Sequence, residues 1–238
     1  MGCIEMAIKE PVRGIFLDLG WTIFCPATGD WRITLKALEY INPKILWSIP
    51  QDKLNAAISK ANEYIKNEIY ITEDEELERY KNYYRTIAEM LPEIDITIEQ
   101  AEIIAYDRVY NDSNYIFFDN AKKIIECLKE KYKIGVISDT DPSIKRVLKN
   151  AGLYDYFDNM ALSYELGENK SSPRMFSHAL EVMKLPAIET VFIDDYENNL
   201  DCASTLGIQS ILITSRPNSQ ESTKYLSIKK LSDLLLYL

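Results

Sequence analysis

The sequence predicts an α/β fold, in which a parallel sheet has helices on both faces and an all-helical domain is inserted. Three observations lead to this prediction. Short apolar runs end in polar residues at Asp18, Ser138 and Asp194, as the buried strands of a parallel sheet do. Strand and helix patterns alternate from residue 119 onward. Between residues 28 and 115, by contrast, apolar residues recur at helical spacing and no convincing strand is found.

The expected core elements follow one another in chain order. The first strand ends at Asp18, and residues 19–27 read as a loop. Asp119 or Asn120 can cap the next helix through its side chain. The later strands are expected over residues 133–138, 160–164, 190–194 and 208–214, and the helices over residues 120–131, 142–150, 173–184, 198–206 and 231–237.

The inserted segment is expected to form four helices. Apolar side chains fall on one helix face in three stretches, from Trp31 to Ile41, from Leu54 to Ile65 and from Leu77 to Ile87. A fourth helix covers about residues 98–109. We therefore place a helical domain at residues 27–115 and a core domain at residues 1–26 and 116–238, both within the usual domain size range.

The composition indicates which binding partners and which cellular compartment are expected. The net charge of −10 argues against nucleic acid or an anionic membrane as a partner, and no apolar run is long enough to span a bilayer. The only histidine is His178 and no C-x-x-C is present, so a zinc site is not expected. The cysteines suggest reduced thiols and a cytoplasmic protein; they are Cys3, Cys25, Cys127 and Cys202.

Two adjacent acids, Asp194 and Asp195, follow the strand that ends near residue 193. Clustered carboxylates repel one another unless a cation or a proton joins them. With Asp18 at the same sheet edge, they form the oxygen-rich ligand set that magnesium prefers. The alternative is that each acid is a solvated turn residue. The occurrence of the acids together favours a metal site over this alternative.

The fragments around Asp18, Ser138, Lys170 and Asp194-Asp195, in this order, resemble the haloacid dehalogenase superfamily of hydrolases, most of which are phosphatases. The string from Gly167 to Phe176 also resembles the family's glycine, lysine, proline and aromatic-helix pattern. The resemblance is to the branch with a helical cap after the first core strand. It implies a Rossmann-like core and a cap that sets the substrate.

The resemblance also implies a role for each site residue. Asp18 is expected to be the nucleophile that forms an aspartyl-phosphate. Ser138 and Lys170 would bind the phosphoryl oxygens, with Lys170 neutralising charge beside Asp18. Asp195 would bind magnesium directly, together with Asp18 and the main-chain carbonyl of Gly20, and Asp194 would support them from behind.

The chain departs from the family at Gly20, where most members have an acid that protonates the leaving group. The first expectation is a magnesium-dependent phosphohydrolase acting on a small phosphorylated metabolite. The main alternative is a weakly active or inactive binding or regulatory module. A phosphonatase would need a cap lysine such as Lys53 or Lys60, and a dehalogenase would lack both magnesium and the paired acid.

The expected cap contains no sequence motif that indicates which substrate it binds. Its nine tyrosines between residues 40 and 115, together with Arg32, Lys36 and Lys53, could line a pocket. Packing between helices and solvated helix faces are the more ordinary explanation for most of these side chains.

Overall fold

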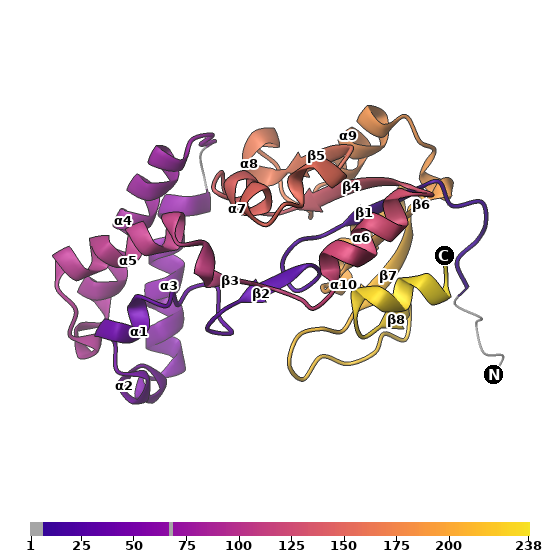
Figure 1. The fold of residues 1–238 in the computed structure, drawn as a ribbon. Helices are drawn as coiled ribbons and strands as arrows, with labels where there is room; N and C mark the ends of the chain where they lie inside the picture. Colours follow the sequence, from indigo (N-terminus) through magenta and orange to yellow (C-terminus); the bar gives the residue numbers. More distant parts are fainter. Residues whose placement is uncertain (1–6, 67–68) are drawn as a thin grey trace. The chain divides into compact units, whose positions relative to one another are not determined.

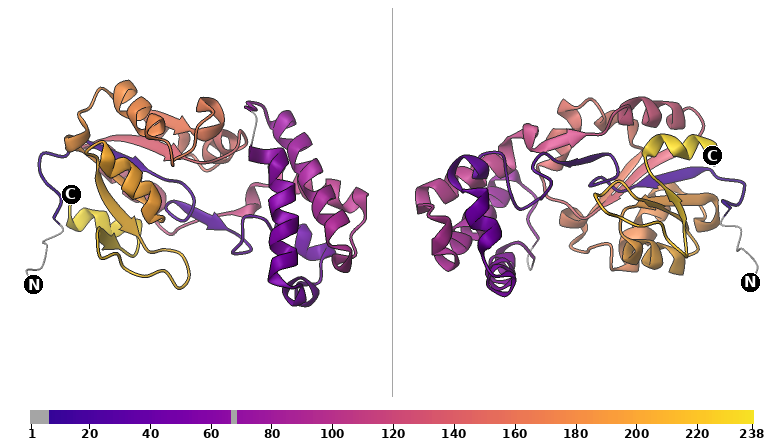
Figure 2. Two further views of the ribbon diagram at one scale, coloured as in Figure 1. Left: turned by 180° about the vertical axis from the view of Figure 1, so that it is seen from behind. Right: turned by 90° about the horizontal axis from the view of Figure 1, so that it is seen from below.

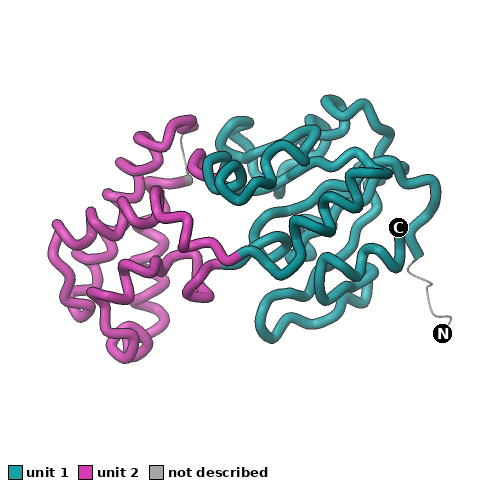
Figure 3. The backbone as a smooth tube through the Cα atoms, viewed as in Figure 1, with its two compact units in different colours: residues 1–25, 117–140, 145–238 teal, residues 26–116, 141–144 magenta. Residues whose placement is uncertain are grey.

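The chain forms two compact units in the computed structural model, which describes residues 7–66 and 69–238 (Figure 3). The first, which we call the core unit, comprises the residues up to 25 together with residues 117–140 and 145–238. The second, the helical unit, comprises residues 26–116 and 141–144. The short segment 141–144, which the sequence analysis placed in the core, groups with the helical unit. Cys3 lies outside the described residues.

A six-stranded parallel sheet forms the centre of the core unit, which confirms the predicted α/β class (Figure 1). Its spatial order is β5-β4-β1-β6-β7-β8. The strands span Gly14–Leu17 (β1), Lys133–Ser138 (β4), Asn159–Leu162 (β5), Thr190–Asp194 (β6), Gln209–Ile213 (β7) and Leu226–Ile228 (β8).

Strands β4 and β6 flank the first strand on its two sides. Leu17, the last residue of β1, lies opposite Val136 of β4 and Ile193 of β6. Because all three strands run in the same direction, their carboxyl ends meet at one edge of the sheet. The sequence positions that follow these ends are therefore brought together.

Helices cover both faces of this sheet, as Figures 1 and 2 show. On one face α9 packs against β4 and β5, and α10 packs against β6 and β7. On the other face α6 contacts β4 and the 3₁₀ helix η5. The helices of the core unit span Ala121–Lys129 (α6), Ile144–Asn150 (α7), Ser163–Leu166 (α8), Pro173–Met183 (α9) and Glu197–Thr205 (α10), with 3₁₀ turns at Tyr154–Tyr156 (η3), Ala187–Glu189 (η4) and Leu231–Leu236 (η5).

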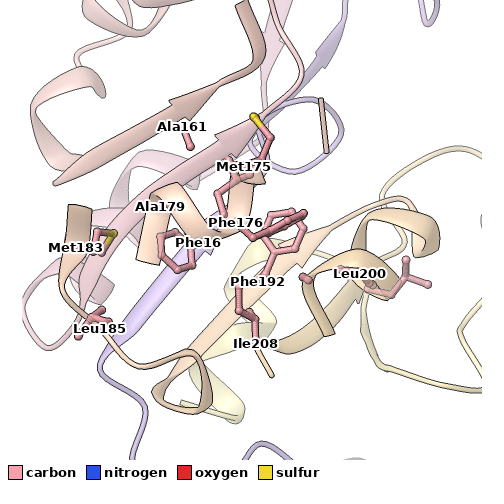
Figure 4. Packing of buried hydrophobic residues seen from close by; sticks show 13 residues of the cluster. Phe16, Ala161, Met175, Phe176, Ala179, Met183, Leu185, Phe192, Leu200 and Ile208 are labelled. Carbon is pink, nitrogen blue, oxygen red and sulfur yellow. The ribbon is translucent and has the colours of Figure 1, made fainter. Parts of the chain in front are cut away.

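Aromatic side chains fill the layer between the sheet and α9 (Figure 4). Phe16 and Phe192 come from neighbouring strands, and Phe176 comes from α9; all three are fully buried. The rings of Phe176 and Phe192 pack edge to face, with centroids 5.2 Å apart. Burial of side chains this large holds the central strands in place, since each contributes roughly 1.5–3 kcal/mol.

The helical unit contains the two long helices that the apolar spacing predicts at 54–65 and 77–87, and the shorter one near 98–109. Two of them start with reciprocal capping boxes, Thr72 with Glu75 and Thr97 with Gln100. None of the described helices has both the length and the apolar character needed to cross a membrane. The elements of this unit span Ala37–Tyr40 (α1), Pro43–Ser48 (α2), Gln51–Lys66 (α3), Glu73–Met90 (α4), Pro92–Ile94 (η1), Ile98–Tyr110 (α5) and Asp112–Asn114 (η2).

The start of the helical unit differs from the prediction. The helix expected from Trp31 to Ile41 is reduced to α1, a single turn. Upstream of α1 the side chain of Thr28 donates to the carbonyl of Ile33 at 2.6 Å, and local bonds of this kind compete with helix formation. The helix α2 starts at the following Asn-Pro pair, because Asn42 caps it and Pro43 occupies its first turn.

The structure differs from the sequence analysis at three further places. Residues 19–27 are not only loop, because Phe24–Pro26 (β2) pairs with Tyr115–Phe117 (β3) where the chain passes between its two units. The edge strand β8 was missed, since three residues are too few to show a pattern. Asn120 makes no side-chain cap on α6 and takes a left-handed φ of 62° instead.

Candidate active site

Asp18 lies at the carboxyl end of β1 and is almost fully buried. Its backbone N–H donates to the carbonyl of Ile193 at 2.9 Å, which continues the pairing with β6. Its side-chain Oδ1 accepts a hydrogen bond from the Ser138 hydroxyl at 2.8 Å and lies 2.7 Å from Lys170 Nζ. Both of these interactions use Oδ1 rather than Oδ2.

Lys170 reaches this site from the loop before α9. The preceding helix α8 ends at Gly167 in a left-handed conformation, and the N–H of Lys170 donates to Asp139 Oδ1 at 2.9 Å. Its Nζ also lies 2.7 Å from Asp194 Oδ2. Burial works against the charged form of Lys170, but the carboxylates of Asp18 and Asp194 outweigh it and raise its pKa above the ordinary value. Lys170 is therefore a permanent cation between two acids.

Asp194 is completely buried, and hydrogen-bond donors surround its carboxylate. Oδ1 accepts from the N–H of Tyr196 at 2.8 Å, and the Asn199 amide donates to Oδ1 and Oδ2 at 3.1 and 3.0 Å. With Lys170 on Oδ2 as well, the carboxylate is fully occupied. This arrangement suits a supporting role better than direct ligation.

Asp195 has a different environment. Its side chain is 4% exposed, and its Oδ2 forms an ion pair with Nε of Arg216. Burial and the neighbouring Asp194 raise its pKa to about 6, against the opposing effect of Arg216. The pKa of Asp18 is raised to about 7, chiefly by burial and despite the nearby Lys170. The site thus holds more negative charge than its surroundings stabilise.

The three acids form one cluster that suits a hard divalent cation. Asp18, Asp194 and Asp195 each offer an oxygen, and these oxygens all lie within 4.8 Å of one another. Gly20 lies two residues beyond Asp18 and pairs with Phe24 in an isolated bridge. The bridge uses the bond from Trp21 N to the Phe24 carbonyl, and among the described backbone bonds none is recorded to the Gly20 carbonyl. The donor set therefore fits magnesium.

The structure brings together every side chain that the sequence analysis selected, and it adds three that were missed. Asp139 holds the backbone of Lys170, Asn199 holds Asp194, and Arg216 pairs with Asp195. Two of these had a usable signal. Asn199 lies in the first turn of α10, the helix that follows Asp194, and Arg216 follows β7, the neighbour of β6 in the sheet. The position of Asp139 beside Lys170 depends on how the loop folds.

The helical unit contains an apolar cavity of about 320 Å³. Tyr83, Tyr84 and Arg32 line it, among mostly aliphatic side chains. Lys36 and Lys53 instead form ion pairs with Glu39 and Glu93 at the surface. The expectation that tyrosines and basic residues line a pocket thus holds for some of these side chains only. Lys60, the other candidate Schiff-base lysine, forms an exposed ion pair with Glu63 at 2.6 Å.

Comparison with known proteins identifies the family. Residues 33–207 match the model of the haloacid dehalogenase-like hydrolases. The D-ribitol-5-phosphate phosphatase of Bacteroides thetaiotaomicron is 28% identical over 90 residues, which cover 35% of this chain and 44% of the relative. The matched segments span 35% to 44% of the length of three curated relatives, this one included.

Solved structures share the fold over almost the whole chain. A dehalogenase crystal structure superposes with a TM-score of 0.66 at 15% identity and covers 97% of this chain and 98% of its own. The magnesium-bound HAD-hydrolase YfnB of Bacillus subtilis superposes with a TM-score of 0.64 at 16% identity and covers 95% of this chain and 98% of its own. The family match covers well over half of the sequence, and the chain therefore belongs to the haloacid dehalogenase-like hydrolases.

Proposed function

We propose that this protein is a magnesium-dependent phosphohydrolase, which cleaves a small phosphorylated metabolite through an aspartyl-phosphate at Asp18. One observation carries the proposal: Ser138 and Lys170 hold Oδ1 of Asp18 beside a pair of buried acids, and these contacts leave Oδ2 unused. The relative named as a D-ribitol-5-phosphate phosphatase supports phosphate chemistry. The magnesium in the YfnB structure supports the cation.

The reaction has two displacements at phosphorus. In the first, a carboxylate oxygen of Asp18 forms a bond to phosphorus while the bond to the leaving oxygen breaks. In the second, water attacks the same phosphorus, the bond to Asp18 breaks, and inorganic phosphate leaves after giving a proton to solvent. Lys170 and the Ser138 hydroxyl stabilise the charge that develops on the phosphoryl oxygens in both steps.

Asp18, Asp195 and the Gly20 carbonyl would hold the magnesium ion, with Asp194 supporting them. When bound, the ion neutralises the negative charge shared by the acids and the phosphoryl group. Lys170 keeps its own charge throughout, because Asp18 and Asp194 raise its pKa above the ordinary value despite its burial. It orients Asp18 and Asp194 with respect to each other through its two contacts of 2.7 Å.

Gly20 shapes the substrate preference within this proposal. A glycine has no side chain that could donate a proton to the departing oxygen, and positioned acid–base help is worth about 10²–10⁴-fold. Substrates whose leaving group departs without a proton, such as aryl or acyl phosphates, are therefore favoured over simple alkyl esters. The helical unit acts as the cap that selects the substrate. Cys25, Cys127 and Cys202 are free thiols, in keeping with a cytoplasmic location.

A phosphatase screen with a metal control tests the proposal. The full chain is assayed against aryl, acyl and sugar phosphates with magnesium and with EDTA. We expect turnover that requires magnesium, and a reductive trap should capture the acyl phosphate on Asp18. Tight binding of a phosphorylated compound without turnover under any condition would show that the protein is a binding module.

A further inference from the structure

Arg216 is a cation at the acid cluster that the proposed mechanism does not use. It lies in the segment between β7 and β8, and its Nε pairs with Oδ2 of Asp195. The preceding residue, Ser215, donates a hydrogen bond to the carbonyl of Trp21, in the turn that follows Asp18. This segment of the core unit therefore contacts both the acid pair and the turn beside the nucleophile.

The two adjacent acids have different partners, and this difference indicates what Arg216 does. Asp194 takes its positive charge from Lys170, and Asn199 and the Tyr196 backbone complete its hydrogen bonds. For Asp195 the described structure records Arg216 as the side chain in ion-pair contact. A buried carboxylate needs a counter-charge, and Arg216 meets this need when no metal is bound.

Magnesium and Arg216 would therefore have the same partner. A divalent ion on Asp195 would lie close to a guanidinium of like charge, and the two repel. The Arg216 side chain is 47% exposed, whereas the carboxylate of Asp195 is only 4% exposed. The Arg216 side chain can move into solvent with little loss of free energy, whereas Asp195 stays fixed at the end of β6.

We propose that Arg216 is a built-in competitor of the divalent cation, neutralising Asp195 in the metal-free protein and leaving it when magnesium binds. This inference rests on the proposed function, because it assumes that Asp195 is a magnesium ligand. It follows that Arg216 lowers the affinity of the site for magnesium, because displacing the arginine reduces the net free energy of magnesium binding.

Magnesium affinity, measured by calorimetry on the EDTA-treated full chain, tests this inference without any activity assay. We expect Arg216→Gln to bind magnesium roughly 3- to 10-fold more tightly than the unmodified protein at low salt. Arg216→Lys keeps the charge and should stay close to the unmodified protein. The gain in Arg216→Gln should shrink as ionic strength rises, since the removed repulsion is partly exposed to solvent.

Arg174→Gln is the matched control, because Arg174 is an exposed arginine of the same unit that pairs with Glu168 at 2.7 Å. Its magnesium affinity should equal that of the unmodified protein. Arg216→Ala provides a second neutral variant if Arg216→Gln folds poorly. Equal or weaker binding by the neutral variants would overturn the inference and leave the proposed function intact.

The two hypotheses fail in different ways. If the unmodified protein binds no magnesium but Arg216→Gln does, Arg216 is the competitor and the unmodified chain is not a magnesium enzyme. If neither protein binds magnesium, both the inference and the proposed metal dependence are wrong.

Discussion

Each unit of the molecule buries a cluster of charged residues, and the two clusters are built differently. In the helical unit Asp141 accepts hydrogen bonds from the hydroxyls of Tyr70 and Tyr80, at 2.8 Å for Tyr80, and from Arg108 at 3.3 Å. Glu76 accepts from the N–H and the hydroxyl of Ser143 at 2.8 and 2.9 Å. Donors therefore surround both acids of the helical unit.

The acids of the core unit are more numerous, and one cation is shared between two of them. Three carboxylates direct oxygens to one place, and Lys170 serves two of them. In the helical cluster each acid accepts hydrogen bonds from hydroxyl, guanidinium or backbone donors, as in a structural network. In the core cluster three carboxylates place oxygens within 4.8 Å of one another, as is typical of a site that binds a hard cation. The convergence of three carboxylates, rather than residue type, distinguishes the core cluster from the helical one.

The largest effect expected from this comparison is the loss of activity in Asp18→Asn. The amide is nearly the same shape and can still accept from Ser138, but it is a poor nucleophile and a weak ligand. We expect hydrolysis of an aryl phosphate to fall by several orders of magnitude. Asp141→Asn is the control, since it removes a buried acid of the other cluster and should retain most of the activity of the folded protein. Equal losses in the two variants would remove the distinction between the clusters.

The second prediction concerns Gly20 and the leaving group. The ratio of kcat/KM for aryl phosphates to kcat/KM for alkyl phosphates should be large. Gly20→Asp should reduce this ratio, because it should raise kcat/KM for alkyl esters by about 10²-fold or more. Trp21 must leave room for the new side chain, and it already has a left-handed φ of 58°. Rapid hydrolysis of alkyl phosphates by the unmodified protein would show that another residue supplies the proton.

A smaller effect separates the two adjacent acids. Asp195→Asn should weaken magnesium binding by about 100-fold or more, whereas Asp194→Asn should weaken it by roughly 10-fold, because Asp194 is already occupied by Lys170 and Asn199. Calorimetric titration of both variants measures the difference. Asp141→Asn should leave magnesium affinity unchanged, and an equal effect of the two core variants would contradict our assignment of Asp195 as the direct ligand.

A further prediction concerns the helical unit alone and the pH dependence of its stability. Burial, and then the charge of Asp141, raise the pKa of Glu76 to about 8. Because the folded protein holds this proton more tightly than the unfolded chain, the free energy of unfolding should fall as pH rises from about 4.5 to about 8. Glu76→Gln removes that dependence, so the variant should gain stability relative to the unmodified protein over this interval, on the order of 2–4 kcal/mol.

Urea unfolding at pH 5, 6.5 and 8 measures this change. The control is Glu39→Gln, which alters a carboxylate at the surface of the same unit, 59% exposed and paired with Lys36. Its difference from the unmodified protein should be small at each pH. A constant difference for Glu76→Gln as well would mean that Glu76 is ionised in the folded protein over the whole interval.

Local pattern determined much of this protein. Strands β4 and β6 have the predicted bounds, because continuous apolar runs of buried parallel strands have one interpretation when bounded by turns. The residues at their carboxyl ends then follow from the parallel direction alone. This is why Asp18, Ser138 and Asp194 could be selected as neighbours, although Asp18 lies more than a hundred residues before the other two in the sequence.

Only the tertiary structure decided how the charges of the site are shared. Lys170 contacts Asp194 as well as Asp18, and Arg216 pairs with Asp195. The sequence indicates that both loops lie near the sheet edge, but the packing of the loops decides which acid each cation meets. The short elements α2, β2 and β8 also required it, since a few residues carry too little periodicity. Periodicity reports which face of an element is buried, and so it predicts strands and long helices. Which donor meets which acid depends on packing between distant segments, which no local pattern encodes.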